Sequence, residues 1–323
     1  MRHYSIIGAA VVLMVLLAAL TGCGGDSNPI EAIKNSVTDG VQATIEEDDS
    51  LPDRDNTPQV LVPEASGNST AEGGDAVIDY SNADNGYLMV KYTGSNDKVK
   101  VLITYQADEP YTYDLQLNGD YNTFPLSQGS GDYSVGVYEN VEGEKYVPAV
   151  EKSISANIGD ELSPFLYPNQ FSNFTESSAC VAKAQEVSAG VKTDLGAVEK
   201  IFIFVVDTVT YDFDKAETVQ SGYVPNPDET LQSKTGICFD YASLSTAMMR
   251  SQGIPCQLVV GYAGSAYHAW IAVYSTDSGK VAGIIEFGAD QFSQMDPTFT
   301  AGGNDADPNL IGDGSNYQPL FYY

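Results

Sequence analysis

Hydrophobic and polar positions divide the chain into four stretches. Residues 6–20 are almost wholly apolar, whereas residues 24 to about 78 are rich in Pro, Gly, Asn, Ser, Asp and Glu and show little hydrophobic periodicity. Residues 79–160 contain short runs of β-branched and aromatic residues separated by turn residues, a pattern typical of strands. From residue 161 onward, helical spacing comes first and strand-like runs follow. The pattern predicts a leader, a polar tether and two folded parts.

The leader has the features of a signal peptide. A short basic start precedes the apolar stretch, which is shorter than most membrane-spanning helices. The stretch ends in Leu20-Thr21-Gly22-Cys23, and this ending resembles a bacterial lipobox. The resemblance implies cleavage after residue 22, a lipid on Cys23 and an extracytoplasmic protein anchored to the cell membrane. The alternative is a single-pass anchor in which Cys23 is incidental.

The predicted domain boundaries follow the four stretches. Residues 1–22 are a signal peptide, and residues 23–78 are a flexible acidic tether whose composition buries too little apolar surface to fold, apart from a short helix within residues 30–45. Residues 79–160 are a small all-β sandwich of Ig-like type. The many tyrosines of this part could form a flat surface that binds carbohydrate. The simpler explanation is that amphipathic rings are common at half-buried strand positions.

Residues 161–323 are predicted to form an α+β domain. Helices are expected over residues 179–189, 195–206 and 235–252. Strands are expected over residues 257–263, 268–275, 281–287 and 291–296. Helices followed by an antiparallel sheet are the order found in α+β folds.

Charge and composition narrow the function. The chain has 323 residues, with 44 acidic and 15 basic side chains and a formal net charge of -29. This charge excludes nucleic-acid binding through clustered Lys and Arg and disfavours tight binding to anionic lipid headgroups. The chain has 2 His and 4 Cys and lacks C-x-x-C pairs, so no metal and no cofactor is predicted. Cleavage after residue 22 would leave His268 as the single His.

Cys238 is the candidate nucleophile because of where it lies in the predicted structure. It stands where a loop enters a predicted helix, and the unpaired backbone N–H groups and dipole there stabilise a thiolate. Gly236 leaves room for a substrate to approach the sulfur. The alternative is a buried, inert thiol, as most cysteines are.

Two further residues complete a possible catalytic set. His268 begins a predicted strand and shares one face with Trp270, so it could act as a general base beside a thiolate. Asp296 ends a later strand, and a carboxylate there could orient the imidazole. Each residue alone is weak evidence, whereas their order along the chain is informative.

Together these segments resemble the transglutaminase-like core, a papain-related superfamily with a Cys-His-Asp triad. The resemblance covers about residues 180–299. It rests on Gly236-Ile237-Cys238, Gly253-Ile254-Pro255-Cys256, Val259-Val260-Gly261-Tyr262, His268-Ala269-Trp270 and Asp296-Pro297-Thr298. It implies a transglutaminase-like, papain-like fold in which Cys238 is the nucleophile, His268 the general acid and base, and Asp296 the residue that orients it.

The resemblance leaves several points open. Tyr211 is a candidate donor to an oxyanion, and Trp270 either packs beneath the histidine or touches substrate. Cys180 and Cys256 either form a disulfide or remain free thiols. The expected function is that of a surface-anchored thiol enzyme that cleaves or transfers an amide in a peptide or cell-wall peptide. The alternative is a non-catalytic binding, adhesion or scaffold lipoprotein with an idle triad.

Overall fold

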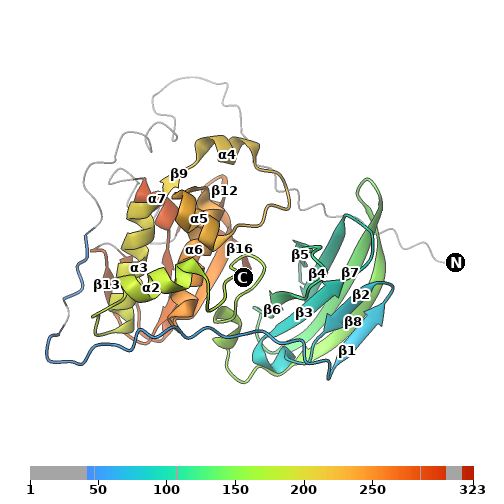
Figure 1. The fold of residues 1–323 in the computed structure, drawn as a ribbon, viewed down its shortest axis with the longest axis horizontal. Helices are drawn as coiled ribbons and strands as arrows, with labels where there is room; N and C mark the ends of the chain where they lie inside the picture. The colour runs from blue at the N-terminus through green and yellow to red at the C-terminus, as the bar shows by residue number, and fades with distance from the viewer. Residues whose placement is uncertain (1–41, 47, 107, 284, 303–314) are drawn as a thin grey trace. The chain divides into compact units, whose positions relative to one another are not determined.

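The computed structural model describes residues 42–46, 48–106, 108–283, 285–302 and 315–323 (Figure 1). The predicted signal peptide, Cys23 and the first part of the predicted tether lie outside the described residues. Two compact units are present: one comprises residues 63–164 and 220–223, and the other comprises the remaining described residues. No helix in the described ranges has the length and hydrophobicity of a membrane span.

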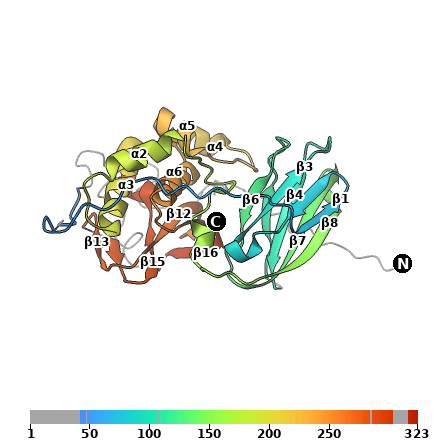
Figure 2. The same cartoon turned by 60° about the horizontal axis from the view of Figure 1, so that its bottom comes forward.

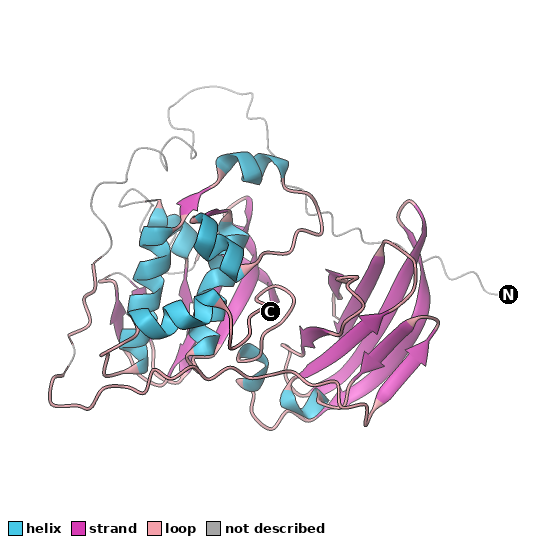
Figure 3. Ribbon diagram, in the orientation of Figure 1, coloured by secondary structure: helices cyan, strands magenta, loops and turns pink. Residues whose placement is uncertain are grey.

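The first unit is built from eight strands and a short 3-10 helix, all between residues 70 and 156 (Figure 3). They are β1 (Thr70–Gly73), β2 (Ala76–Asp79), η1 (Ala83–Asn85), β3 (Tyr87–Tyr92), β4 (Val99–Tyr105), β5 (Tyr111–Asp114), β6 (Asn122–Pro125), β7 (Gly131–Glu142) and β8 (Lys145–Ala156). The strands form two antiparallel sheets, with the orders β1-β2-β3-β6 and β5-β4-β7-β8. The strand content agrees with the all-β part predicted from the sequence.

Alternating burial explains why these segments form strands. In β4, Val99, Val101 and Ile103 are buried while the residues between them are half-buried. Tyr113 and Phe124 meet edge to face in the core, with ring centroids 4.8 Å apart. Five of the strand tyrosines are buried, so their rings pack the interior instead of forming a platform for carbohydrate: Tyr87, Tyr92, Tyr111, Tyr113 and Tyr133.

The second unit combines helices with an antiparallel sheet. Its helices are α2 (Ala179–Val187), α3 (Asp194–Thr208), α4 (Phe213–Thr218), α5 (Pro227–Ser233), α6 (Cys238–Ser251) and α7 (Pro297–Ala301), and the 3-10 helix η2 (Ser163–Phe165) lies at the change of unit. The main sheet has the order β15-β12-β11-β16, formed by β11 (Cys256–Ala263), β12 (Ala266–Ser275), β15 (Gln291–Met295) and β16 (Tyr317–Tyr322). α6 packs against β11 and β12, so it runs across the centre of the sheet.

Two small strand pairs complete the second unit. β9 (Thr210–Tyr211) pairs in parallel with β10 (Thr235–Gly236), directly before α6. β13 (Gly279–Val281) pairs with β14 (Ile285–Phe287). The prediction of one strand over residues 281–287 is therefore wrong. Ala282 and Gly283 have φ angles of 51° and 72°, and this left-handed backbone turns the chain between two short strands.

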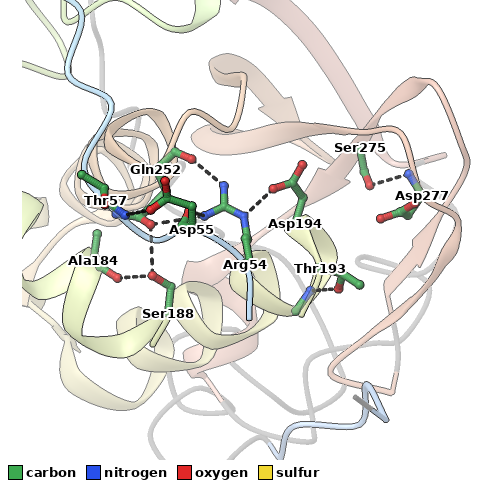
Figure 4. Close-up of polar contacts among 11 residues, drawn as sticks. Arg54, Asp55, Thr57, Ala184, Ser188, Thr193, Asp194, Gln252, Ser275 and Asp277 are labelled. Atoms are coloured by element: carbon green, nitrogen blue, oxygen red, sulfur yellow. Dashed lines mark hydrogen bonds and ion pairs between the residues drawn. The ribbon is translucent and has the colours of Figure 1, made fainter. Parts of the chain in front are cut away.

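The prediction of a flexible tether over residues 23–78 is wrong for the part that the structure describes. Residues 70–79 form β1 and β2, and residues 44–46 and 48–59, here called the strap, bind the helical unit. The Arg54 guanidinium donates to Asp194 Oδ1 at 2.5 Å and to the Gln252 carbonyl at 2.6 Å (Figure 4). Asn56 reaches the carbonyl of Gln185 in α2, and the course of the strap can be followed in Figure 2.

The start of the strap is held by one buried carboxylate. Glu199 lies in α3 with 1% of its surface exposed. Its oxygens accept from the backbone N–H groups of Thr44 at 2.8 Å, Ile45 at 3.1 Å and Ala282 at 2.7 Å. Glu199 therefore joins the strap, α3 and the turn between β13 and β14.

Replacing Glu199 with Ala should release the start of the strap. Loss of a charged acceptor shared by three N–H groups should lower the free energy of unfolding by about 2–4 kcal/mol. Urea denaturation measures that loss, and tryptic cleavage after Arg54 in the folded protein measures release of the strap. Glu186→Ala is the matched control, because Glu186 pairs with Lys183 at the surface of the same unit. Equal tryptic rates in both variants would show that Glu199 does not hold the strap.

Candidate active site

The structure brings Cys238, His268 and Asp296 together from three separate elements. Cys238 is the first residue of α6, His268 lies in β12, and Asp296 follows β15 as the N-cap of α7. His268 Nε2 lies 2.7 Å from Asp296 Oδ2, and Cys238 is near enough for its charge to act on the imidazole. Because Asp296 occupies Nε2, Nδ1 is the nitrogen that remains for the thiol.

The local sequence explains how Cys238 is presented. Ile237 precedes α6 in an extended conformation, and its N–H donates to Asp240 Oδ2 at 2.8 Å. A Cβ on residue 236 would lie 2.5 Å from the Asp240 Cβ, so glycine is required there. Gly236 was predicted to leave room for a substrate, but its neighbour in the structure is the side chain that caps the helix.

Accessibility distinguishes Cys238 from the other described cysteines. Cys238 is half-buried, whereas Cys180 and Cys256 are buried, and all three are free thiols. The disulfide alternative for Cys180 and Cys256 is therefore wrong. Burial raises the pKa of Cys256 to about 11 and also raises the pKa of Cys180. Neither buried thiol is suited to act as a nucleophile near neutral pH.

The environment of His268 favours its protonated form. Burial of the ring lowers its pKa, but the negative charges of Asp296 and Cys238 outweigh burial and raise the pKa to about 10. The ring stacks on Phe299 with centroids 4.6 Å apart and an interplanar angle of 26°. The His268 ring is therefore protonated at neutral pH, and its rotation is restricted.

Asp296 is fixed by four donors. Its Oδ1 accepts from the backbone N–H groups of Thr298 and Phe299, both at 3.0 Å, and this caps α7. Its Oδ2 accepts from Tyr317 Oη at 2.8 Å in addition to the contact with His268. Tyr317, in β16, was missed by the sequence analysis, whose motifs end near residue 299. The aromatic residues at positions 317 and 321–323 were the available indication of a last strand.

Comparison with known proteins identifies the domain that carries the first two of these residues. Residues 181–282 match the model of the transglutaminase-like superfamily. This part of the chain is a transglutaminase-like domain. The match includes Cys238 and His268 and ends before Asp296, so only the geometry connects Asp296 with the other two.

Individual relatives are more distant. UPF0252 protein MJ1282 of Methanocaldococcus jannaschii is 28% identical over 241 residues, which are 67% of this chain and 66% of that protein. A candidate cysteine protease from Cytophaga hutchinsonii has a TM-score of 0.32 and 15% identity, covering 79% of this chain and 86% of its own. Red sea bream transglutaminase has a TM-score of 0.29 and 13% identity, covering 66% and 48%. With TM-scores this low, the two structural likenesses carry no argument.

Two other predicted site residues lie near the triad of the transglutaminase-like domain. Trp270 is 2% exposed, and its ring stacks 6.1 Å from that of His268, so it packs in the core and does not reach substrate. Tyr211 lies in β9, opposite Gly236 in the parallel pair. Burial, then the charge of Cys238, raises the pKa of Tyr211, so its hydroxyl is protonated near the thiol. Its position is compatible with the predicted donor role.

Side chains that could bind a metal ion do not cluster in the part of the chain that the structure describes. Among the described residues of both units, no three His, Cys, Asp or Glu side chains are arranged to hold a metal ion.

Replacing Tyr317 with Phe should remove one of the two donors to Asp296 Oδ2. Burial raises the pKa of Tyr317, so the hydroxyl is a donor at any ordinary pH. Because a buried acceptor loses a partner, the free energy of unfolding should fall by about 1–3 kcal/mol, as measured by urea denaturation. Tyr138→Phe is the control, since Tyr138 donates to a carboxylate at the surface. A smaller loss than in this control would show that the bond to Asp296 contributes nothing.

Proposed function

We propose that this chain is a thiol enzyme that cleaves or transfers an amide through a thioester on Cys238. The observation that carries the proposal is the hydrogen bond of 2.7 Å between His268 Nε2 and Asp296, together with a half-buried Cys238 thiol at a helix N-terminus whose charge acts on the same imidazole. A thiolate, an imidazolium and an orienting carboxylate are the groups that nucleophilic acyl transfer requires.

In the first half of the proposed reaction, Cys238 Sγ attacks the carbonyl carbon of the amide and a C–S bond forms. The negative oxygen accepts hydrogen bonds from the Cys238 backbone N–H, which has no helical partner at the first position of α6, and from the Tyr211 hydroxyl. His268 gives its proton to the nitrogen as the C–N bond breaks, and the amine leaves.

In the second half, water or an amine attacks the thioester carbonyl. His268 accepts the proton of the attacking group, the C–S bond breaks, and Cys238 returns as a thiolate paired with the imidazolium. Water as the acceptor gives a peptidase or amidase, and an amine as the acceptor gives crosslinking. The proposed substrate is an amide of a peptide or of a cell-wall peptide.

The proposed location is the outer face of the cell membrane. The ending Leu20-Thr21-Gly22-Cys23 supports a lipid on Cys23, and the net charge of -29 is suited to a protein that stays clear of anionic surfaces. Cys23→Ala should release the protein from the membrane fraction, and retention of the variant there would overturn the lipid anchor.

We further propose that the β unit is an Ig-like sandwich. The strand orders β2-β3-β6 and β5-β4-β7-β8 support this, because they divide consecutive strands between two antiparallel sheets as Greek-key sandwiches do. This unit could bind a wall polymer or a protein, which is the role expected if the triad is idle.

Thiol labelling tests the enzyme proposal without a known substrate. Iodoacetamide at about pH 6 should label Cys238 selectively, as mapped by mass spectrometry, and His268→Ala should slow that labelling. Equal slow reaction at Cys180, Cys238 and Cys256 would overturn the thiolate. Purified peptidoglycan and a peptide library, each incubated with the protein and with Cys238→Ala, should give products only with the former. Identical product spectra would favour the non-catalytic alternative.

A further inference from the structure

An ion pair at the N-terminus of α6 joins Lys215 to Asp240, two residues after Cys238, and is not used in the proposed reaction. Asp240 is the third residue of α6 and is fully buried. Its Oδ2 accepts from the Ile237 N–H and from Lys215 Nζ, both at 2.8 Å. Lys215 lies in α4 with 31% of its side chain exposed, and its own backbone N–H is held by Asp212, the N-cap of that helix.

The position of Asp240 creates an electrostatic conflict. A carboxylate at the third position of a helix stabilises the N-terminus, and here it caps the N–H group directly before Cys238. The same negative charge opposes a second anion at the N-terminus, and the reactive form of Cys238 is an anion. Both groups also act on Tyr211, whose pKa is raised by burial and then by the charges of Cys238 and Asp240.

We propose that Lys215 is a positioning residue for the Cys238 thiolate, because it neutralises the carboxylate that caps α6. The inference rests on the proposed function insofar as Cys238 reacts as a thiolate. With Lys215 in place, Asp240 can hold the first turn of α6 in position without repelling the sulfur. Without Lys215, the buried carboxylate of Asp240, two residues after Cys238 in the sequence, loses a positively charged partner.

Other titratable groups also face Cys238 and set the background for the test. His268 provides the nearest positive charge, and its protonation depends in turn on Asp296. Tyr211 in β9 and Tyr267 in β12 also feel the charge of Cys238, and Asp212, the N-cap of α4, acts on Tyr211. Lys215 differs from all of these, because its effect on the thiol should depend on Asp240.

The experiment is the pH dependence of Cys238 alkylation by iodoacetamide in the full chain. Lys215→Met should raise the midpoint of the rate profile by about 1 pH unit, and Lys215→Arg should restore it. In the Asp240→Asn background, where the amide oxygen still accepts from the Ile237 N–H, Lys215→Met should have no effect on the midpoint. Lys183→Met is the matched control, because Lys183 is also 31% exposed and paired with a carboxylate.

The outcomes separate the inference from the proposed function. An unchanged midpoint in Lys215→Met, or an equal shift in the Asp240→Asn background, would overturn the role of Lys215 while leaving the thiolate intact. If Cys238 of the parental protein is not alkylated at acidic pH, the proposed function is overturned, and the inference with it. The thermal transition of Lys215→Met shows whether this variant folds. If it does not fold, the midpoints of the alkylation profiles of Lys215→Arg and Asp240→Asn decide, and both should stay within about 0.3 pH units of the parental midpoint. A larger rise of either midpoint would overturn the inference.

Discussion

Replacing Arg250 with Met should lower the free energy of unfolding by about 3–5 kcal/mol. Arg250 lies in the last turns of α6 and is fully buried. Its guanidinium donates to the carbonyls of Cys256 at 2.7 Å and 2.9 Å, Tyr167 at 2.6 Å and Tyr323 at 2.6 Å. Methionine fills similar volume but removes these donors from carbonyls in three different segments of the unit, although the Tyr323 oxygen also accepts from the Leu258 N–H.

An opposing contribution comes from the buried charge itself. Burial lowers the pKa of Arg250 to about 10, so the side chain is still charged at neutral pH and the cost of burying it is constant below that value. The variant removes this cost. We expect the lost hydrogen bonds to dominate, because each hydrogen bond to a charged group contributes about 1.5–3 kcal/mol.

Urea denaturation at about pH 7 measures the net effect, with the slope checked for two-state behaviour. Lys145→Met is the control, since it removes one positive charge from a side chain that is 76% exposed. A midpoint for Arg250→Met equal to that of the control would show that the desolvation of the guanidinium cancels its hydrogen bonds.

The elements around the triad were largely predictable because their sequence patterns are local. β12 has a continuous buried run that begins at His268, and α6 begins directly at Cys238, where Gly236 precedes the helix. Asp296 directly precedes Pro297, which has no N–H to donate to a neighbouring strand. The sequence therefore also indicated where β15 ends. Juxtaposition of the three residues came from the family resemblance and not from these patterns.

The remaining contacts depend on partners that are far apart in the chain. Glu199 binds the strap across 155 residues, and Arg250 binds a carbonyl 73 residues later. The strap has a polar composition typical of a tether, yet Arg54 fixes it through hydrogen bonds that composition does not record. Tyr317 was missed for the same reason, since its bond to Asp296 exists only once β16 joins the sheet beside β11.

Replacing Asp296 with Asn should slow alkylation of Cys238 at about pH 7.5 by about 10-fold. Asn can keep the α7 cap through its amide oxygen, which replaces Oδ1 as the acceptor for Thr298 and Phe299. Its NH2 group then faces His268 Nε2. Because an NH2 group donates, Nε2 must become an acceptor, the ring must carry its proton on Nδ1, and the imidazolium loses its carboxylate.

The pH dependence follows from the sign of the His268 shift. The pKa of His268 is raised from 6.5 to about 10, with Asp296 the larger of the two causes that raise it. In the parental protein the imidazolium is therefore present through neutral pH and is lost only as the pH approaches 10. In Asp296→Asn it should be lost near the ordinary value of about 6.5, so at about pH 7.5 the thiol ionises without a cationic partner. An isolated thiol is only about 10% ionised at pH 7.5, which sets the expected loss of rate.

The rate profile of both proteins is measured by quenching the alkylation at set times and quantifying the labelled peptide by mass spectrometry. The measurement is repeated from about pH 5 to pH 10. The two profiles should differ most near about pH 7.5 and converge near the alkaline end, where any accessible thiol is ionised. Asp277→Asn is the matched control, because Asp277 is exposed in the same unit and should leave the profile unchanged. A rate at about pH 7.5 in Asp296→Asn within about twofold of the parental rate would show that His268 is held charged by the thiolate alone, and the carboxylate would then be a helix cap without a catalytic role.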